Sequence, residues 1–254
     1  MKRAVSWSGL AAGVLVLAVW VAAWEAIVRA GWISPVFLPG PSAIAAALQD
    51  GWHEGLMARL GGTVMRMVVG WLLASLLGIG LGTLIGCSRT LRTWLQPTLE
   101  ALRPLPASAL MPLFIALMGL SPAMVLAVIA FGAMWPVLLG TVHGFASIEP
   151  RLQEVARVLG LSRRGFIVKI GLPNAMPDAL AGMRLSMTVS LILAVVGEIL
   201  ASQDGLGSAV ILAARSFRSA ELFAGVVLLG VIGLVSNTLL GAAEAWLLRW
   251  RSVA

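Results

Sequence analysis

The chain consists mostly of long apolar runs separated by short polar segments. An apolar run of about 20 residues is long enough to cross the hydrocarbon core of a bilayer as a helix. Such runs recur over residues 9–28, 64–86, 98–119, 123–143, 179–201 and 222–248. This pattern predicts an all-helical, polytopic membrane protein with six transmembrane helices, and it leaves no room for a separate soluble domain.

The third run, 98–119, is the least regular. It contains Arg103, Pro104, Pro106 and Pro112. Because a proline removes a backbone hydrogen-bond donor, we expect this helix to be kinked or partly broken where neighbouring helices cover it.

Composition and charge also favour a membrane location. Apolar residues make up 59% of the chain and charged residues 11%, whereas soluble domains carry about 25% charged residues. The net charge of +7 comes from arginines scattered between apolar runs rather than from a basic stripe with interleaved aromatic residues, so we predict no nucleic-acid partner. The first run exceeds the roughly 7–15 apolar residues of a signal peptide, and we interpret it as a retained span.

The distribution of Lys and Arg predicts the orientation, because positively charged loops are retained in the cytoplasm. With the N-terminus inside, the outer side carries Arg29, Arg59, Arg66, Arg215 and Arg218. The cytoplasmic side carries the larger set, which is Lys2, Arg3, Arg89, Arg92, Arg103, Arg151, Arg157, Arg163, Arg164, Lys169, Arg184, Arg249 and Arg251. We therefore expect a multi-pass protein of the bacterial inner membrane with both termini in the cytoplasm.

This topology makes 144–178 the largest cytoplasmic segment and 29–63 the largest outer one. An Ala-rich stretch over 42–49 follows a cluster of helix breakers in the outer segment, and we expect it to form an interfacial helix. In the second span Gly78, Gly82 and Gly86 share one helical face, where another helix can approach closely. Packing within the chain and contact with another subunit both satisfy that spacing.

The most informative motif lies in the cytoplasmic segment. It has the form Glu-x-Ala, three residues, Gly, nine residues, Ile-x-Leu-Pro. Its residues are Glu154, Val155, Ala156, Gly160, Ile170, Leu172 and Pro173.

Local patterns predict that this motif forms two short helices. Apolar residues recur at helical spacing from Arg151 to Leu159, which indicates an amphipathic helix. We expect Gly160 to end it in a left-handed conformation and Ser162 to cap a second helix. Pro173 is expected to follow the end of that second helix.

The motif resembles the signature of the permeases of binding-protein-dependent ABC importers, from which this chain departs only at Val155. Weaker matches at 37–39, 102–106, 197–201 and 205–207 resemble the nitrate, sulfonate and taurine branch of these permeases. The resemblance implies a type I ABC importer permease fold in one domain, 1–254, with a coupling loop at about 144–178. It implies import of a small oxyanion such as an aliphatic sulfonate, taurine or nitrate, with another small metabolite as the alternative.

The resemblance also implies the partners. A cytoplasmic ABC ATPase would dock on the seven motif residues, by the mode in which apolar anchors of a helix enter a groove. A solute-binding protein would deliver the solute from outside, and a second copy of the chain would complete the pathway as a homodimer. The chain itself would bind no cofactor, since ATP and Mg would belong to the ATPase. A P-loop needs a Gly-Lys pair, and the only lysines, Lys2 and Lys169, follow Met1 and Val168.

Polar residues in the fifth run are candidates for the transport path. Glu198 within an apolar run is costly unless it is paired or faces water, so it either lines the path, pairs across subunits or reaches interfacial water. Ser186, Thr188 and Ser190 alternate along the same span and either line the path or make hydrogen bonds between helices.

Two other classes of protein share some of these sequence features. Ser121 and His143 superficially resemble an intramembrane protease dyad, but they would lie at opposite ends of one helix, about 33 Å apart at the usual rise per residue. We therefore predict no catalytic residues, and the two histidines are too far apart in sequence to suggest a metal site. A channel or secondary transporter would also be polytopic but would not need the ATPase-docking motif.

Overall fold

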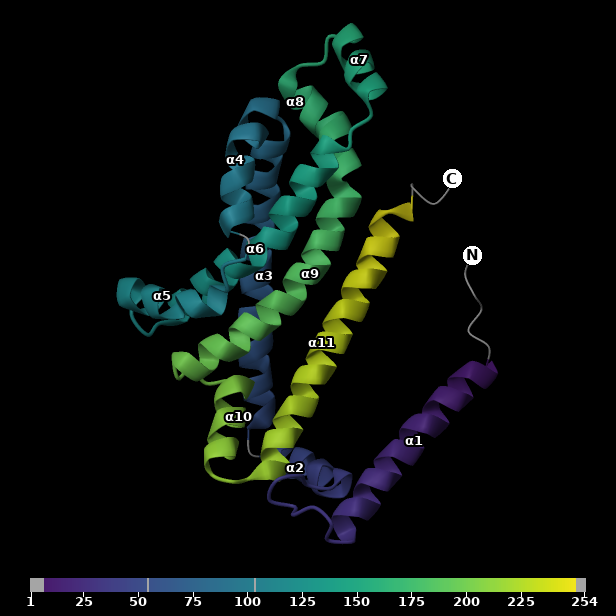
Figure 1. Ribbon diagram of the computed structural model, residues 1–254, viewed down its shortest axis with the longest axis vertical. Coiled ribbons are helices and arrows are strands. Elements are labelled where there is room, and N and C mark those ends of the chain that lie inside the picture. The colour runs from purple at the N-terminus through teal and green to yellow at the C-terminus, as the bar shows by residue number, and fades with distance from the viewer. Residues whose placement is uncertain (1–6, 54, 103, 250–254) are drawn as a thin grey trace.

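The computed structural model describes residues 7–53, 55–102 and 104–249, and its regular elements there are all helices (Figure 1). Four residues used in the orientation count, Lys2, Arg3, Arg103 and Arg251, lie outside this part of the chain. The α-helices are α1 (Trp7–Arg29), α2 (Pro41–His53), α3 (Leu56–Gly86), α4 (Arg89–Leu102), α5 (Met111–Met118), α6 (Pro122–Ala146), α7 (Pro150–Val158), α8 (Arg163–Phe166), α9 (Leu172–Leu200), α10 (Leu206–Arg215) and α11 (Ser219–Leu247). A 3-10 helix, η1 (Ala107–Leu110), precedes α5, and a π-helical turn, η2 (Ile167–Gly171), joins α8 to α9.

Within the described residues, five helices are long and apolar enough to span a membrane, namely α1, α3, α6, α9 and α11. They match five of the six expected spans. The third expected span, 98–119, is not one continuous helix: α4 ends at Leu102, and η1 and α5 follow as separate short elements. The prolines account for the break, because Pro106 adopts an extended conformation before η1 and Pro112 lies in the first turn of α5.

Helices α3, α6 and α9 form the centre of the bundle, and glycines allow α3 to approach α6. A Cβ atom on Gly78 would lie 2.7 Å from Cβ of Val137, and one on Gly82 would lie 2.6 Å from Cβ of Thr141. The glycine face of α3 is therefore used for packing within the chain, which was one of the two alternatives that the sequence left open.

Glycines also bring α6 and α9 together. A Cβ atom on Gly182 of α9 would lie 2.4 Å from the carbonyl oxygen of Pro136, and one on Gly144 of α6 would lie 2.4 Å from Cα of Ala175. Backbone lies against backbone at these points, so the relative position of the two helices is set without large side chains.

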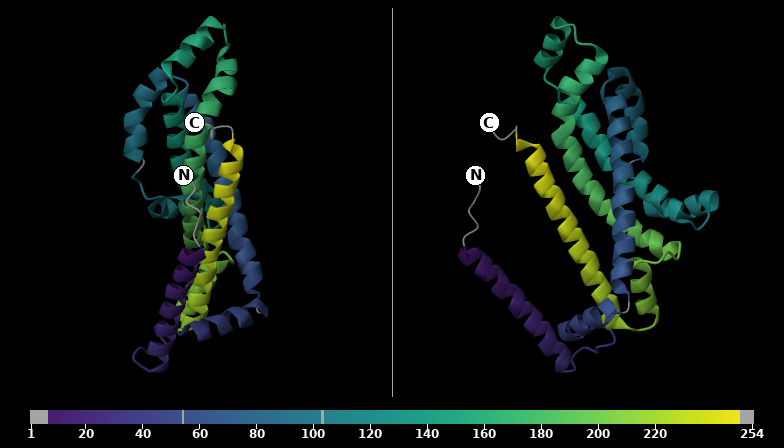
Figure 2. Two further views of the ribbon diagram at one scale, coloured as in Figure 1. Left: turned by 90° about the vertical axis from the view of Figure 1, so that its right-hand side faces the viewer. Right: turned by 180° about the vertical axis from the view of Figure 1, so that it is seen from behind.

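Helix α1 stands apart from the bundle in Figure 1 and in the right view of Figure 2, and it meets the rest near α2. Glu25 on α1 accepts hydrogen bonds from the backbone N–H (3.0 Å) and hydroxyl (2.7 Å) of Ser42 at the start of α2. Most of the remaining surface of α1 is exposed and apolar. A helix is present where one was expected at 42–49, as the longer α2. The sequence did not predict α10.

The close contact at Gly82 gives a test with a matched control. Gly82→Ala should destabilise the protein by about 1–3 kcal/mol, because the new methyl group overlaps Thr141 and the carbonyl oxygen of Leu138. Gly80→Ala, two residues away, meets nothing within 4 Å and should be neutral or slightly stabilising, since Ala is the better helix former. The measurement is the melting temperature of each purified variant in detergent. Equal melting temperatures for the two variants would contradict the α3–α6 packing.

Candidate functional site

The segment 150–171 projects beyond the long helices at one end of the molecule (Figures 1 and 2). Gly160, just after the end of α7, has a φ of 60°. Its N–H bonds to the carbonyl of Arg157, and the N–H of Leu161 bonds to the carbonyl of Ala156, each at 3.0 Å. These two bonds form a Schellman motif, which needs a left-handed residue at this position. Ser162 then caps α8 by accepting a hydrogen bond from Gly165 N at 3.1 Å. The predicted conformations of Gly160 and Ser162 are confirmed.

The predicted role of Pro173 as a terminator is wrong. The helix that begins at Arg163 runs through η2 into α9 as one helix of 38 residues, ending at Leu200. In the π turn the N–H of Leu172 bonds to the carbonyl of Ile167, which shifts the hydrogen-bond register. Pro173 therefore lies in the first turn of the new α-helical register, a position that tolerates a missing N–H.

The residues of the motif and its neighbour Val158 separate into an outward group and an inward group. Val155 and Val158 on α7 are 50% and 87% exposed, and Glu154 is also exposed. Ala156 is buried and lines a small gap between α7 and α8 together with Phe166. The α7 surface thus presents an apolar patch with a carboxylate beside it, and Ala156 and Gly160 maintain the shape of the loop.

The inward group packs on Phe145, at the end of α6. Phe145 is 4% exposed, and Ile170 and Leu172 pack against the cluster that it forms with Ile148 and Ala175. Ile170 and Leu172 are therefore half-buried within this chain and not on the surface formed by α7.

Two glycines enclose the ring of Phe145. A Cβ atom on Gly171 would lie 2.3 Å from Cε1 of this ring, and a Cβ atom on Gly86 would lie 2.7 Å from Cβ of Phe145. The ring thus lies between the end of α3 and the π turn, and it connects the projecting loop to the membrane helices. Asn174 adds a polar link, because its side-chain amide donates to the carbonyl of Gly144 at 2.8 Å.

Glu198 occupies a buried ion pair at the opposite end of α9. One carboxylate oxygen accepts from Nε and Nη2 of Arg66 at 3.0 and 2.8 Å, and the other accepts from the Thr63 hydroxyl at 3.0 Å and from Gly207 N at 2.8 Å. The carboxylate is fully buried, so it does not reach interfacial water, and its cationic partner belongs to the same chain. Glu198 thereby joins α3, α9 and the first turn of α10, where backbone N–H groups favour an anion.

The three hydroxyl residues of α9 lie in different surroundings. Ser186 and Ser190 are fully buried, and the Ser190 hydroxyl donates to the carbonyl of Ser186 at 2.9 Å. Neither residue lines the cavity described next. Thr188 is exposed and lines a separate hollow between α9 and α11 with Asn237. The structure does not bring these residues together with Glu198.

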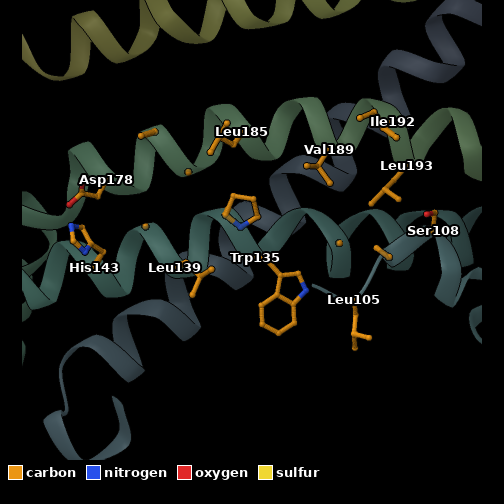
Figure 3. Close-up of a pocket in the computed structure, with 16 residues that line it drawn as sticks. Leu105, Ser108, Trp135, Leu139, His143, Asp178, Leu185, Val189, Ile192 and Leu193 are labelled. Atoms are coloured by element: carbon orange, nitrogen blue, oxygen red, sulfur yellow. The ribbon is translucent and has the colours of Figure 1, made fainter. Parts of the chain in front are cut away.

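A cavity of about 590 Å³ lies between η1, α6 and α9 (Figure 3). Its wall is mainly apolar, and its polar side chains are Ser108, Trp135, His143 and Asp178. Apart from the prolines of the third run, no pattern in the sequence predicted this site, because three separate elements line it.

Ser121 and His143 lie toward opposite ends of α6. Ser121 caps the start of α6 by accepting from Met124 N at 3.1 Å, while His143 lies near the end of this 25-residue helix. They cannot form a nucleophile and base pair. Among the described residues there is no group of three His, Cys, Asp or Glu side chains that could hold a metal ion.

The family model described as "binding-protein-dependent transport system inner membrane component" matches residues 74–253. A protein described as an aliphatic sulfonates transport permease, SsuC of Bacillus subtilis, is 34% identical over 241 residues, which cover 94% of this chain and 87% of that protein. The nitrate import permease NrtB of Leptolyngbya laminosa is 32% identical over 76% of this chain and 69% of its own length.

A solved amino acid ABC transporter, crystallised with histidines, shares the fold. Its TM-score is 0.61 at 16% identity, covering 79% of this chain and 96% of that one. The matched family and the shared fold agree with a multi-pass arrangement and with a type I importer permease. The chain therefore belongs to the inner-membrane permease components of binding-protein-dependent ABC transport systems.

Proposed function

We propose that this permease imports a small oxyanion such as an aliphatic sulfonate, taurine or nitrate. The proposal rests on the projecting α7–α8 loop with its exposed apolar patch, together with the solutes named for the two relatives. Another small metabolite is the alternative solute. A secondary transporter or channel would have no use for a projecting docking loop.

We further propose that residues 1–254 form one permease domain and that an ABC ATPase docks on the coupling loop, 144–178. Val155 and Val158 have the exposure expected of anchors that enter a groove, and Glu154 lies beside them. ATP and Mg belong to that ATPase, and this chain binds neither cofactor. A solute-binding protein delivers the solute at the opposite end, near α2 and α10.

The proposed assembly contains a second copy of the chain as a homodimer. The cavity between α6 and α9 is open on one side, and a second copy of the chain would cover it. We place the protein in the bacterial inner membrane with both termini in the cytoplasm. In support, α1 begins and α11 ends toward the side of the molecule where α7 lies (Figure 1).

The solute class is tested on the cognate binding protein. Taurine, an aliphatic sulfonate or nitrate should raise its melting temperature, by mass action on the folded state. The measurement is thermal unfolding with each anion and with uncharged and cationic metabolites as controls. Stabilisation by an uncharged or cationic metabolite alone would contradict the proposed solute class.

The docking role is tested with Gly160→Val and Glu154→Lys. A β-branched residue disfavours positive φ, so the first change should disturb the turn, and the second reverses a charge on the docking surface. Each should lower ATPase affinity by about 100-fold, since misplaced anchors cost several kcal/mol. The measurement is ATPase copurification and solute uptake from membranes that contain equal amounts of each variant.

The matched control for the turn is Gly31→Val. Gly31 also has a positive φ, but it lies in the segment between α1 and α2, far from the coupling loop. This control should leave ATPase binding unchanged. If Gly160→Val and Glu154→Lys both retained normal ATPase binding and uptake, the loop would not be the docking site.

Phe145 is expected to couple the docked loop to the membrane helices. Phe145→Ala should remove the ring that lies between Gly86 and Gly171 and leave a cavity. For a buried aromatic residue this lowers the free energy of unfolding by about 3–5 kcal/mol. The α7 surface is unchanged, so the ATPase should still copurify and hydrolyse ATP while uptake per assembled complex falls. Phe37→Ala, at a position 74% exposed before α2, is the control. Uptake that falls only in proportion to the amount of protein would indicate a purely structural role.

A further inference from the structure

The cavity between η1, α6 and α9 is apolar along most of its length and has one charged end. Among the described residues that line it, His143 and Asp178 are the only titratable ones. Both lie at the end nearest α7, His143 near the end of α6 and Asp178 in the first turns of α9. The remaining polar side chains, Ser108 and Trp135, lie farther along the wall (Figure 3).

The backbones that carry these two side chains are held close together. A Cβ atom on Gly140 would lie 2.4 Å from the carbonyl oxygen of Asp178, so α6 and α9 touch one turn before His143. In Figure 3 the imidazole and the carboxylate both lie at this end of the cavity. His143 is exposed and Asp178 is partly exposed, so both are open to a solute.

The basic neighbour of Asp178 on α9 is engaged elsewhere. Arg184, the next charged residue along α9, donates from Nε to the Asn237 side chain at 2.7 Å and lies 4.0 Å from Glu244 on α11. η1 and α5 carry no charged residue. Among the described residues that line the cavity, His143 is therefore the basic side chain at the same end as this carboxylate.

A lone carboxylate at this place would oppose an oxyanion, because like charges repel more strongly where little water separates them. An imidazole at the same end of the cavity offers an N–H donor to the anion and, where it carries a positive charge, offsets the charge of the carboxylate. Resting on the proposed import of an oxyanion, we propose that His143 is a specificity-determining residue that contacts the solute and compensates Asp178 at the α7 end of the transport path.

The experiment uses the complete complex of permease, ATPase and binding protein in lipid vesicles, with taurine and nitrate as probes. The variants are His143→Gln, Asp178→Asn, the double variant, and His53→Gln as the control at the only other histidine. His143→Gln should lower the maximal uptake rate by about tenfold, because the carboxylate is left uncompensated. Asp178→Asn should lower the KM for both anions, because the opposing carboxylate is gone. The double variant should recover most of the rate that His143→Gln loses, for the same reason.

Recovery of the uptake rate in the double variant would distinguish charge compensation from packing. If His143 had a purely structural role, the effects of the two substitutions on the uptake rate would add, and the double variant would not recover. Equal ATPase copurification in all variants shows that assembly is unchanged. The proposal is overturned if His143→Gln transports at the wild-type rate, or if the double variant is as slow as His143→Gln. Absence of oxyanion uptake by the wild-type complex would instead overturn the proposed solute class, and this proposal with it.

Discussion

The close approach of three helix backbones is the constraint on which the rest of the structure depends. Lipid tails are as apolar as leucine, so burial of apolar surface does little to hold membrane helices together, and van der Waals contact between closely packed helices must do more. Glycines on α3, α6 and α9 allow that contact, with backbone atoms of one helix lying where a side chain of another would stand. The positions of the cavity, the loop and the buried ion pair all follow from this arrangement.

The two ends of the bundle are held by different chemistry. At one end a buried carboxylate gathers donors from α3 and α10, and such a pair is strongly destabilising to break because it leaves an unpaired buried charge. At the other end an aromatic ring lies between glycines and contacts aliphatic side chains, with no ion pair in its cluster. The van der Waals contacts of this ring have no strict angular requirement, whereas the hydrogen bonds of the ion pair do. Helices can therefore shift more readily at the ring than at the ion pair.

Local features of the site were predictable from sequence, whereas long-range partners were not. Gly160 and Ser162 act within one helical turn, so their roles follow from neighbouring residues alone. The position of Pro173 was predicted wrongly because proline is found both after the end of a helix and in the first turn of one. The π turn places Pro173 in a first turn, and no residue pattern in the sequence indicates a π turn. Phe145 is one apolar residue in an apolar run and carries no signal.

The Arg66–Glu198 pair lies between these cases. Each residue is a charge inside an apolar run, which indicates that each needs a partner, but 132 positions separate them in the sequence. The cavity was not predictable for a similar reason, because three elements from different parts of the chain line it. The third expected span is not a single helix. It is interrupted at the prolines that made it the least regular of the six runs.

The unbroken helix from Arg163 to Leu200 has a mechanical consequence. At 1.5 Å per residue its 38 residues measure about 57 Å, roughly twice the thickness of the hydrocarbon core. The Phe145 contact at Gly171 divides it into a short arm of about 12 Å toward α7 and a long arm of about 44 Å toward Leu200. One helix therefore connects the loop, where helices can shift, to a far end that Glu198 holds against α3 and α10.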